Sequence, residues 1–287
     1  MIQGVFTAII TPFYKNLEIN FSLLEELTKY QEKNGISGLI PCGTNGEYPS
    51  LTVDEAKKVI KTVVDVKKDL IIIAGVGRAS LKETIELAKF SDGLSNAIMI
   101  GAPFYFKPVS ESGLFQFYSR VLESVKCPCF LYNIPRFTGI SISIELIKKL
   151  LKFNNLAGLK DSSGDIRNLK DYINSIPTLN FFSGSDALIF QGLKLGTKGG
   201  ISALGNVFPK KVMRIFTTFK ENKLKVSEKE QNEIIELRNL FKKFGTIAVF
   251  KKYLQALGFE ESFVRPPLSN LSDADFSKIR SSNLISL

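Results

Sequence analysis

Residues 70–101 read LIIIAGVGRASLKETIELAKFSDGLSNAIMIG, and this stretch carries the pattern that decides the fold. It starts with a short apolar run rich in β-branched residues, 70–76, and ends with a second one, 97–101. Between them, Ser80-x-x-Glu83 has the form of a capping box, in which two side chains satisfy backbone N–H groups at the start of a helix. Two apolar strands joined through a helix are typical of a β-α-β unit in a parallel sheet.

The same alternation extends from this stretch in both directions, and no linker rich in Pro, Gly or Ser interrupts it. Thr52-x-x-Glu55 is another capping box, and Gly35 follows the first helical pattern as a C-terminal cap. Eight such units predict one α/β domain, a closed (β/α)8 TIM barrel, with a doubly wound sheet as the alternative. The runs expected to be strands are residues 5–11, 38–42, 70–76, 97–101, 129–134, 156–160, 179–183 and 199–203.

The strand pattern stops after Pro209. Apolar residues such as Ile234, Leu237 and Phe241 then recur at helical spacing, so we expect the remaining C-terminal part to be all helical. The prediction is a barrel over residues 1–222 and a helical extension over residues 223–287, packed together as one structural unit. Because barrel enzymes place their chemistry where the strands end, functional residues are expected at the carboxyl ends of the eight runs.

Composition excludes several classes of function. Hydrophobic residues make up 44% of the 287 residues and charged residues 23%, which is typical of a globular protein. No apolar run approaches the roughly 20 residues that span a bilayer, and the N-terminus lacks the pattern of a signal peptide, so we expect a cytoplasmic protein without a membrane partner. The chain has no histidine, and its three cysteines lack metal-ligand spacing, so Ser-His-Asp triads and His-bound metals are excluded. We expect no metal and no cofactor.

The formal net charge is +10, from 38 Lys and Arg against 28 Asp and Glu. Charge of this sign suggests an anionic ligand or a nucleic acid. The lysine pairs are spread along the chain at helical spacings, however, which is typical of solvated helix faces. No motif with interleaved aromatic residues accompanies them, so we expect no nucleic-acid partner.

Polar residues follow the predicted strands at three points. Thr44 lies in a Gly-Thr-Asn-Gly sequence whose exposed N–H groups and hydroxyl would suit a carboxylate, although a simple turn has the same composition. Tyr132 is able to relay protons in a chain without histidine, or else it packs on the core. Leu159 and Lys160 face opposite ways on a strand, so one of them points into the barrel. If it is Lys160, burial favours the neutral amine that a nucleophile needs; a lysine that reaches solvent is the alternative.

In their order and spacing, the motifs resemble those of the dihydrodipicolinate synthase and N-acetylneuraminate lyase family. The resemblance covers nearly the whole chain, from Thr11-Pro12-Phe13 onward. The motifs are Gly43-Thr44-Asn45-Gly46-Glu47, Tyr132-Asn133-Ile134-Pro135, Gly158-Leu159-Lys160-Asp161, Ser183-Gly184-Ser185-Asp186 and Arg265-Pro266-Pro267-Leu268. The resemblance implies a (β/α)8 barrel with additional C-terminal helices, a homotetramer, no cofactor, and a reversible reaction of the keto acid pyruvate with an aldehyde.

The resemblance also implies roles for residues. Lys160 would attack the keto carbon of pyruvate and form a Schiff base. Tyr132 would carry protons, and Thr44, with the backbone N–H groups of Thr44 and Asn45, would bind the carboxylate. Tyr105 matches a tyrosine that completes this hydroxyl relay from a neighbouring subunit.

The second substrate is less clear from the motifs. The synthases of the family carry an arginine two residues after the proline of the Tyr-Asn-x-Pro motif; here Phe137 stands there, and Arg136 precedes it. The run Pro49-Ser50-Leu51 resembles instead the 2-keto-3-deoxygluconate aldolases, which form pyruvate and glyceraldehyde. Some of these accept the 6-phosphate, and Lys107, Lys242 and Thr246 lie near the positions of their phosphate-binding Arg and Ser residues. The residues expected to bind substrate are Thr44, Asn45, Arg136, Gly184, Ser185, Ile201, Ser202, Lys107 and Thr246.

The leading hypothesis is therefore a class I aldolase, a lyase, for 2-keto-3-deoxygluconate, with its 6-phosphate left open as an additional substrate. Asn45 replaces a threonine common in the family, which resembles the 4-hydroxy-2-oxoglutarate aldolases. That activity and dihydrodipicolinate synthase remain the enzymatic alternatives. The non-catalytic alternative is a relative of these enzymes that binds a keto acid without converting it.

Overall fold

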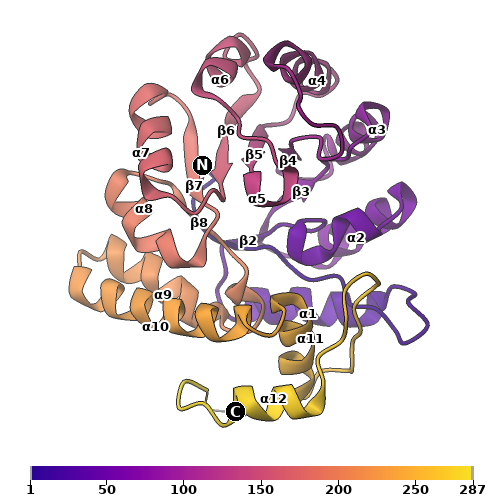
Figure 1. The fold of residues 1–287 in the computed structure, drawn as a ribbon, viewed down its shortest axis with the longest axis vertical. Coiled ribbons are helices and arrows are strands. Elements are labelled where there is room, and N and C mark those ends of the chain that lie inside the picture. Colours follow the sequence, from indigo (N-terminus) through magenta and orange to yellow (C-terminus); the bar gives the residue numbers. More distant parts are fainter. Residues whose placement is uncertain (1, 286–287) are drawn as a thin grey trace.

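A computed structural model describes residues 2–285 of the chain (Figure 1). Eight parallel strands close into a barrel in chain order, and β8 pairs with β1. The predicted barrel is thus confirmed, and the doubly wound alternative is excluded because the sheet has no open edge. The strands are β1 (Gly4–Thr7), β2 (Gly38–Leu39), β3 (Ile71–Gly75), β4 (Ala97–Gly101), β5 (Cys129–Asn133), β6 (Leu156–Asp161), β7 (Asn180–Ser183) and β8 (Gly199–Ser202).

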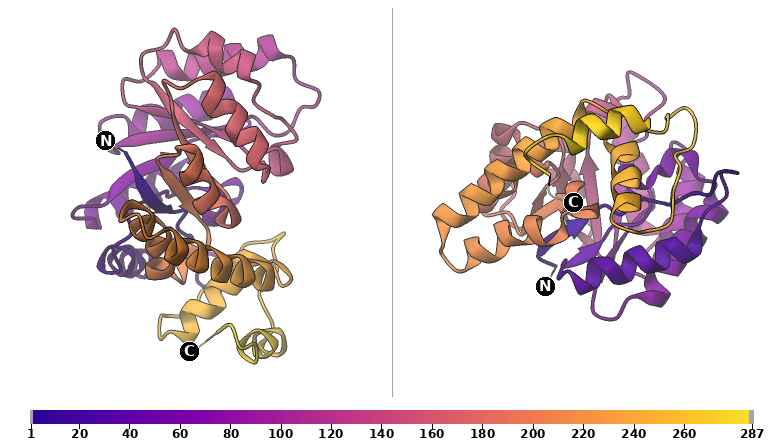
Figure 2. Two further views of the ribbon diagram at one scale, coloured as in Figure 1. Left: turned by 90° about the vertical axis from the view of Figure 1, so that its left-hand side faces the viewer. Right: turned by 90° about the horizontal axis from the view of Figure 1, so that it is seen from below.

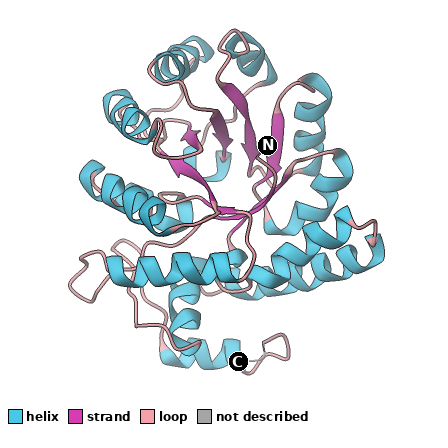
Figure 3. Ribbon diagram, turned by 180° about the vertical axis from the view of Figure 1, so that it is seen from behind, coloured by secondary structure: helices cyan, strands magenta, loops and turns pink. Residues whose placement is uncertain are grey.

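Helices surround the strands as an outer ring, which Figure 3 shows in cyan around the magenta barrel. The ring consists of α1 (Phe21–Lys33), α2 (Val53–Val66), α3 (Leu81–Ser91), α4 (Glu111–Glu123), α6 (Ile144–Leu150), α7 (Ile166–Ser175), α8 (Ile189–Leu195) and α9 (Pro209–Lys220). A short helix, α5 (Pro135–Thr138), follows β5. None of the helices in the described part of the chain is both long and apolar enough to cross a membrane.

The predicted helix signals explain where several helices begin and end. At α2, both bonds of the Thr52–Glu55 capping box are present. At α3, the structure shows one of the two bonds, from the Glu83 N–H to the Ser80 hydroxyl at 3.3 Å. Gly35 follows the end of α1 with φ of 77°, the left-handed conformation that favours glycine at this position.

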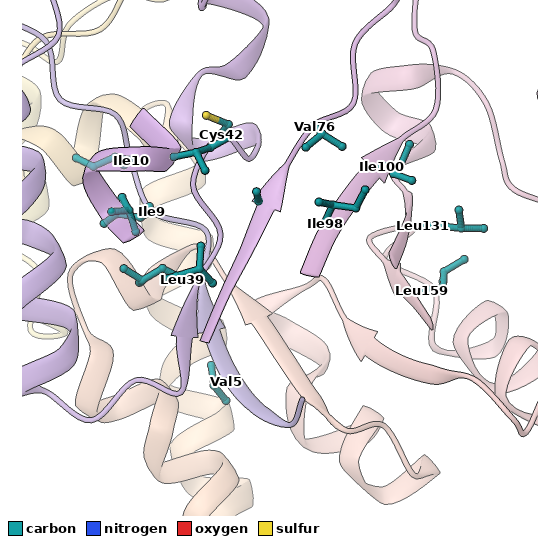
Figure 4. Close-up of a cluster of buried hydrophobic side chains, with 14 of the residues drawn as sticks. Val5, Ile9, Ile10, Leu39, Cys42, Val76, Ile98, Ile100, Leu131 and Leu159 are labelled. Atoms are coloured by element: carbon teal, nitrogen blue, oxygen red, sulfur yellow. The ribbon is translucent and has the colours of Figure 1, made fainter. Parts of the chain in front are cut away.

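Two apolar layers determine which side chains reach the barrel interior. The outer layer lies between strands and helices, and Figure 4 shows part of it, including Leu131 and Leu159 from adjacent strands. The inner layer fills the barrel itself: the ring of Phe182 meets those of Phe6 and Phe130 edge to face, at centroid distances of 5.6 and 5.7 Å. Because side chains alternate along a strand, the residues that follow Leu131 and Leu159 point inward.

The C-terminal part consists of α10 (Leu224–Lys242), α11 (Thr246–Ala256) and α12 (Asp273–Arg280). Helix α10 lies beside α9, while α11 and α12 lie together at one side of the barrel (Figures 1 and 2). The expectation of an all-helical C-terminus was wrong for residues 257–272, which form no helix. Pro266 and Pro267 lack backbone donors and restrict the residues before them, and Phe263 instead forms an antiparallel bridge with Phe13.

Candidate active site

A cavity of about 840 Å³ opens at the carboxyl ends of the strands. Its walls come from the ends of β1, β5, β6 and β8, from the loops after β2 and β7, and from the junction of α10 and α11. The helical extension thus closes one side of the site that the barrel strands form.

Tyr132 and Lys160 face this cavity from neighbouring strands, where they are register partners. Lys160 is only 5% exposed, and its Nζ lies 4.0 Å from the centroid of the Tyr132 ring. The sequence left open whether Leu159 or Lys160 enters the barrel; the structure places Lys160 inside and Leu159 in the outer layer. The cavity therefore holds a buried amine against a phenol ring.

The residues that follow this pair fix its orientation from the other face of the sheet. Asn133 and Asp161 are also register partners, and the Asn133 Nδ2 donates to Asp161 Oδ1 at 2.7 Å. Asp161 Oδ2 accepts from the Ser163 hydroxyl at 2.7 Å, and Asn133 Oδ1 accepts from the Ile142 N–H at 3.0 Å. Because these polar groups satisfy one another outside the barrel, both strands are held with Tyr132 and Lys160 turned inward.

Thr44 reaches the same phenol from the loop after β2. Its Oγ1 lies 3.3 Å from the Tyr132 Oη, within hydrogen-bonding distance, and either hydroxyl is able to donate. Thr44 and Asn45 begin a 3-10 turn, η1 (Thr44–Gly46), so their N–H groups have no acceptor within that turn. Both residues line the cavity. The loop thus offers a hydroxyl and two N–H donors close to the amine, a set suited to a carboxylate.

Gly184 gives the amine room on its other side. A Cβ at this position would lie 2.0 Å from Ser162 Oγ and 2.8 Å from Lys160 Cε.

We expect Gly184→Ala to lower the free energy of unfolding by about 1–3 kcal/mol, because the added methyl overpacks this contact. Chemical denaturation measures the change. Gly43→Ala is the matched control, since its Cβ would meet ordinary contacts at 3.6 Å, and an equal loss in both variants would contradict the explanation.

Asp186, which follows β7, is the buried acid of the cavity wall. Its carboxylate accepts hydrogen bonds from the Ser202 hydroxyl and from the N–H groups of Ala203 and Leu204, the last two at 3.2 and 3.3 Å. Burial raises the pKa of Asp186, and these hydrogen bonds oppose the rise. Asp186, which follows β7, therefore binds three donors at and just after the end of β8 and so links the ends of the two strands.

Three cationic side chains besides Lys160 line the cavity: Arg136 on α5, and Arg238 and Lys242 on α10. Within residues 2–285, no ion pair includes any of them. Arg136 lies over the ring of Phe137, 5.6 Å from its centroid, and Phe137 also lines the cavity. The site thus carries three cationic groups, of which Arg238 also lowers the pKa of the buried Asp186 through its charge.

Most of the residues predicted from the sequence meet in this cavity. Three do not line it. Tyr105 lies on the loop after β4 and is 77% exposed. The residues that do line the cavity are Lys160, Tyr132, Thr44, Asn45, Arg136, Gly184, Ser185, Ile201 and Thr246.

The other two exceptions correct the prediction. Ile201 and Ser202 are neighbours on one strand, so only one of them faces the cavity; Ser202 points the opposite way and bonds to Asp186. Lys107 lies in a separate cavity of about 280 Å³, against Gly139, because the loop after β4 carries it away from the strand ends.

Sequence reasoning assigned no role to Arg238 or Asp186. Arg238 belongs to an ordinary charged helix, and its only signal is its place one turn before Lys242, next to the buried Leu237 and Phe241. Asp186 ends the motif Ser183-Gly184-Ser185-Asp186, in which the small residues are the ones expected to bind substrate. In the part of the chain that the structure describes, no three His, Cys, Asp or Glu side chains are grouped to hold a metal ion.

Comparison with known proteins identifies the family. A model of the dihydrodipicolinate synthetase family matches residues 1–282. The 4-hydroxy-tetrahydrodipicolinate synthase of Brachyspira hyodysenteriae is 32% identical over 282 residues, which is 98% of this chain and 96% of that protein.

Solved structures agree. A crystal structure of dihydrodipicolinate synthase has 30% identity and a TM-score of 0.91, covering 99% of this chain and 100% of its own. A prophage protein of the dihydrodipicolinic acid synthase family from E. coli K12, solved in complex with pyruvate, has 25% identity and a TM-score of 0.93, covering 98% and 97%. The chain that holds this buried lysine therefore belongs to the dihydrodipicolinate synthetase family and is a lyase of the aldolase type.

Proposed function

We propose that Lys160 is the Schiff-base lysine of this enzyme and that pyruvate is the keto acid it binds. The observation that carries the proposal is the position of the Lys160 Nζ, 5% exposed in the cavity and 4.0 Å from the Tyr132 ring. The neutral amine attacks the keto carbon, water leaves, and an iminium forms. Loss of a methyl proton then gives an enamine, whose carbon attacks the aldehyde while the aldehyde oxygen takes up a proton. Water then hydrolyses the resulting iminium and frees the product and Lys160, and the reverse sequence cleaves the product.

Tyr132 and Thr44 complete the chemistry in this proposal. The Tyr132 hydroxyl gives a proton to the carbinolamine hydroxyl, which leaves as water, and accepts one from the substrate hydroxyl that becomes the aldehyde. The Thr44 hydroxyl lies 3.3 Å from the Tyr132 hydroxyl and exchanges protons with it. The free N–H groups of Thr44 and Asn45 bind the pyruvate carboxylate, which turns its keto carbon toward Lys160.

The substrate that we propose is 2-keto-3-deoxygluconate, cleaved to pyruvate and glyceraldehyde. Phe137 supports this choice, because it stands where the synthases of the family are expected to carry the arginine that grips a substrate carboxylate. Its ring lines the cavity and offers no charge to such a group. Four-carbon semialdehydes with a carboxylate therefore lose the contact with an arginine at this one position, whereas glyceraldehyde has no carboxylate to bind there.

The 6-phosphate of the same sugar acid is the second substrate in this proposal. Arg136, Arg238 and Lys242 line the cavity and form no ion pair in the described residues, although the charge of Arg238 also acts on the buried carboxylate of Asp186, so a phosphate there would meet several cationic groups. Guanidinium groups suit phosphate particularly well, because they donate two parallel hydrogen bonds. Lys107, which the sequence suggested for this role, has no part in it.

This phosphate subsite yields a prediction. Arg238→Met should lower kcat/KM for the 6-phosphate about 10-fold to 100-fold, the value of one or two charge-assisted hydrogen bonds, and should lower it much less for the unphosphorylated acid. Coupled assays of pyruvate release measure both. Lys243→Met is the matched control, since Lys243 adjoins Lys242 but does not line the cavity. Equal losses with both substrates would contradict the subsite.

A panel of aldehydes with pyruvate tests the substrate choice. We expect the highest catalytic efficiency with glyceraldehyde or its phosphate. A preference for aspartate semialdehyde would overturn the choice and establish the activity for which the Brachyspira relative is named. A preference for glyoxylate would instead identify a 4-hydroxy-2-oxoglutarate aldolase, and binding of pyruvate without product from any aldehyde would identify a non-catalytic relative.

The assembly is also part of the proposal. We propose a cytoplasmic homotetramer in which Tyr105 reaches the hydroxyl pair of a neighbouring subunit. Tyr105 and Phe106 support it, because these adjacent aromatic side chains are each 77% exposed and pack edge to face at 5.3 Å. Exposed aromatic pairs of this kind are typical of surfaces that associate.

A further inference from the structure

Glu47 ends the loop that carries Thr44, yet its side chain points away from the cavity. It is 2% exposed, and its Oε1 accepts a hydrogen bond from Lys251 Nζ at 2.6 Å. Lys251 lies on α11 and is also 2% exposed. A fully buried ion pair thus joins the loop after β2 to the C-terminal extension, across 204 positions of sequence.

The tail beyond α11 completes this pair. The second carboxylate oxygen of Glu47 accepts from the backbone N–H of Arg265 at 2.9 Å, and Lys251 Nζ also donates to the carbonyl oxygen of Phe263 at 2.5 Å. The ring of Phe13 lies against both cations, 4.3 Å from Lys251 Nζ and 4.4 Å from Arg265 Cζ. Phe13, Glu47 and Arg265, which belong to three different motifs and do not line the cavity, therefore meet in one cluster.

Arg265 extends the same cluster to the start of α2. Its guanidinium donates to the Ser50 carbonyl at 2.7 Å and to Glu55 Oε2 at 2.9 Å. The hydrogen bond from Arg265 lowers the pKa of Glu55, which is also the second partner of the capping box of α2. The turn that leads from Glu47 into α2 is thereby held at both ends.

The geometry of Glu47 shows why the loop needs such an anchor. Its φ of 54° lies in the left-handed region, which a residue with a side chain adopts only when its surroundings hold it there. Its N–H donates to the Thr44 carbonyl at 3.1 Å, so the Glu47 backbone and the Thr44 backbone are fixed together. Moving the Glu47 carboxylate would shift the N–H groups of Thr44 and Asn45.

Stability alone does not account for the pair. Taking two charges out of water is unfavourable, and well-packed uncharged residues often replace a buried ion pair without loss of stability. Burial here lowers the pKa of Lys251 to about 8, even though Glu47 favours its charged form. The ion pair differs from apolar packing because its hydrogen bonds are directional. They fix the Glu47 carboxylate in one place.

We propose that the buried Glu47–Lys251 pair is a positioning device: it holds the N–H groups of Thr44 and Asn45 where they bind the keto-acid carboxylate. The C-terminal extension therefore takes part in the binding of the keto acid from outside the cavity. This inference rests on the carboxylate site proposed for Thr44 and Asn45. Glu47 and Lys251 are positioning residues, since neither lines the cavity.

The test is the double variant Glu47→Gln, Lys251→Met, which removes both charges so that neither is left buried alone. We expect the KM for pyruvate to rise about 10-fold or more, the value of one charge-assisted hydrogen bond, with a smaller change in kcat. Lys252→Met is the matched control. It breaks the neighbouring pair of α11, between Lys252 and Asp273 at 2.8 Å, where Asp273 is 89% exposed, and it should leave the KM unchanged.

A second readout separates positioning from general damage. Borohydride trapping of the imine should slow about 10-fold with pyruvate in the double variant but stay unchanged with acetone, a ketone without a carboxylate. Equal slowing with both ketones, or an unchanged KM in a folded double variant, would overturn the proposal. A wild-type enzyme that traps no pyruvate would instead refute the proposed function, so the two failures are distinguishable.

Discussion

Replacing Lys160 with alanine is expected to lower turnover by about four orders of magnitude or more, because the reaction then has no nucleophile to form the imine. Steady-state assays of pyruvate release measure the loss. Lys160→Arg is a second variant, which provides a positive charge and much of the same volume. Its guanidinium does not lose its proton and therefore does not attack a ketone. We expect both variants to be equally inactive.

The two variants also separate covalent from electrostatic catalysis. If Lys160→Arg retained much of the activity, the amine would act only as a charge near the substrate, and the imine mechanism would be wrong. Circular dichroism and the midpoint of unfolding serve as the check on folding.

Tyr132→Phe has the second largest expected effect. The variant keeps the ring that packs 4.0 Å from Lys160 Nζ but removes the hydroxyl 3.3 Å from Thr44. Loss of a positioned acid and base should lower kcat by about 100-fold to 10,000-fold. Exchange of the pyruvate methyl protons in heavy water, followed by NMR, should slow together with turnover, because enamine formation needs the same proton transfer.

Tyr172→Phe is the matched control for this prediction. Tyr172 is also buried and its hydroxyl donates to the Ile142 carbonyl, but it lies outside the cavity. Its loss should lower stability and leave kcat nearly unchanged. A Tyr132→Phe enzyme with normal proton exchange would show that another group carries the protons.

The barrel was predictable because its signal is local and repeated. Parallel strands buried on both faces are continuous apolar runs, and the capping residues Thr52 and Ser80 mark helix starts between them. The local pattern did not predict which face of its strand Lys160 lies on. Alternation along the strand allowed either Leu159 or Lys160 to face inward, and the choice depends on how Asn133 and Asp161 pair across two strands.

Contacts between distant segments explain what the sequence did not reveal. Arg238 lines the cavity because the end of α10 reaches one side of it, and no local pattern on that helix distinguishes Arg238 from other charged positions. Lys107 stands near a predicted strand end, but a loop takes it elsewhere. Glu47 and Arg265 were recognisable as motif residues, while their contact across 218 positions gives them a physical role that spacing could not show.

The central claim is that one amine inside the barrel becomes covalently bound to a keto acid. Borohydride reduction in the presence of pyruvate, followed by peptide mass spectrometry, tests it most directly. We predict a stable adduct on Lys160 in the wild type and none on this peptide in Lys160→Ala. An unmodified Lys160 in an enzyme that still turns over, or an adduct on a different lysine, would contradict the account.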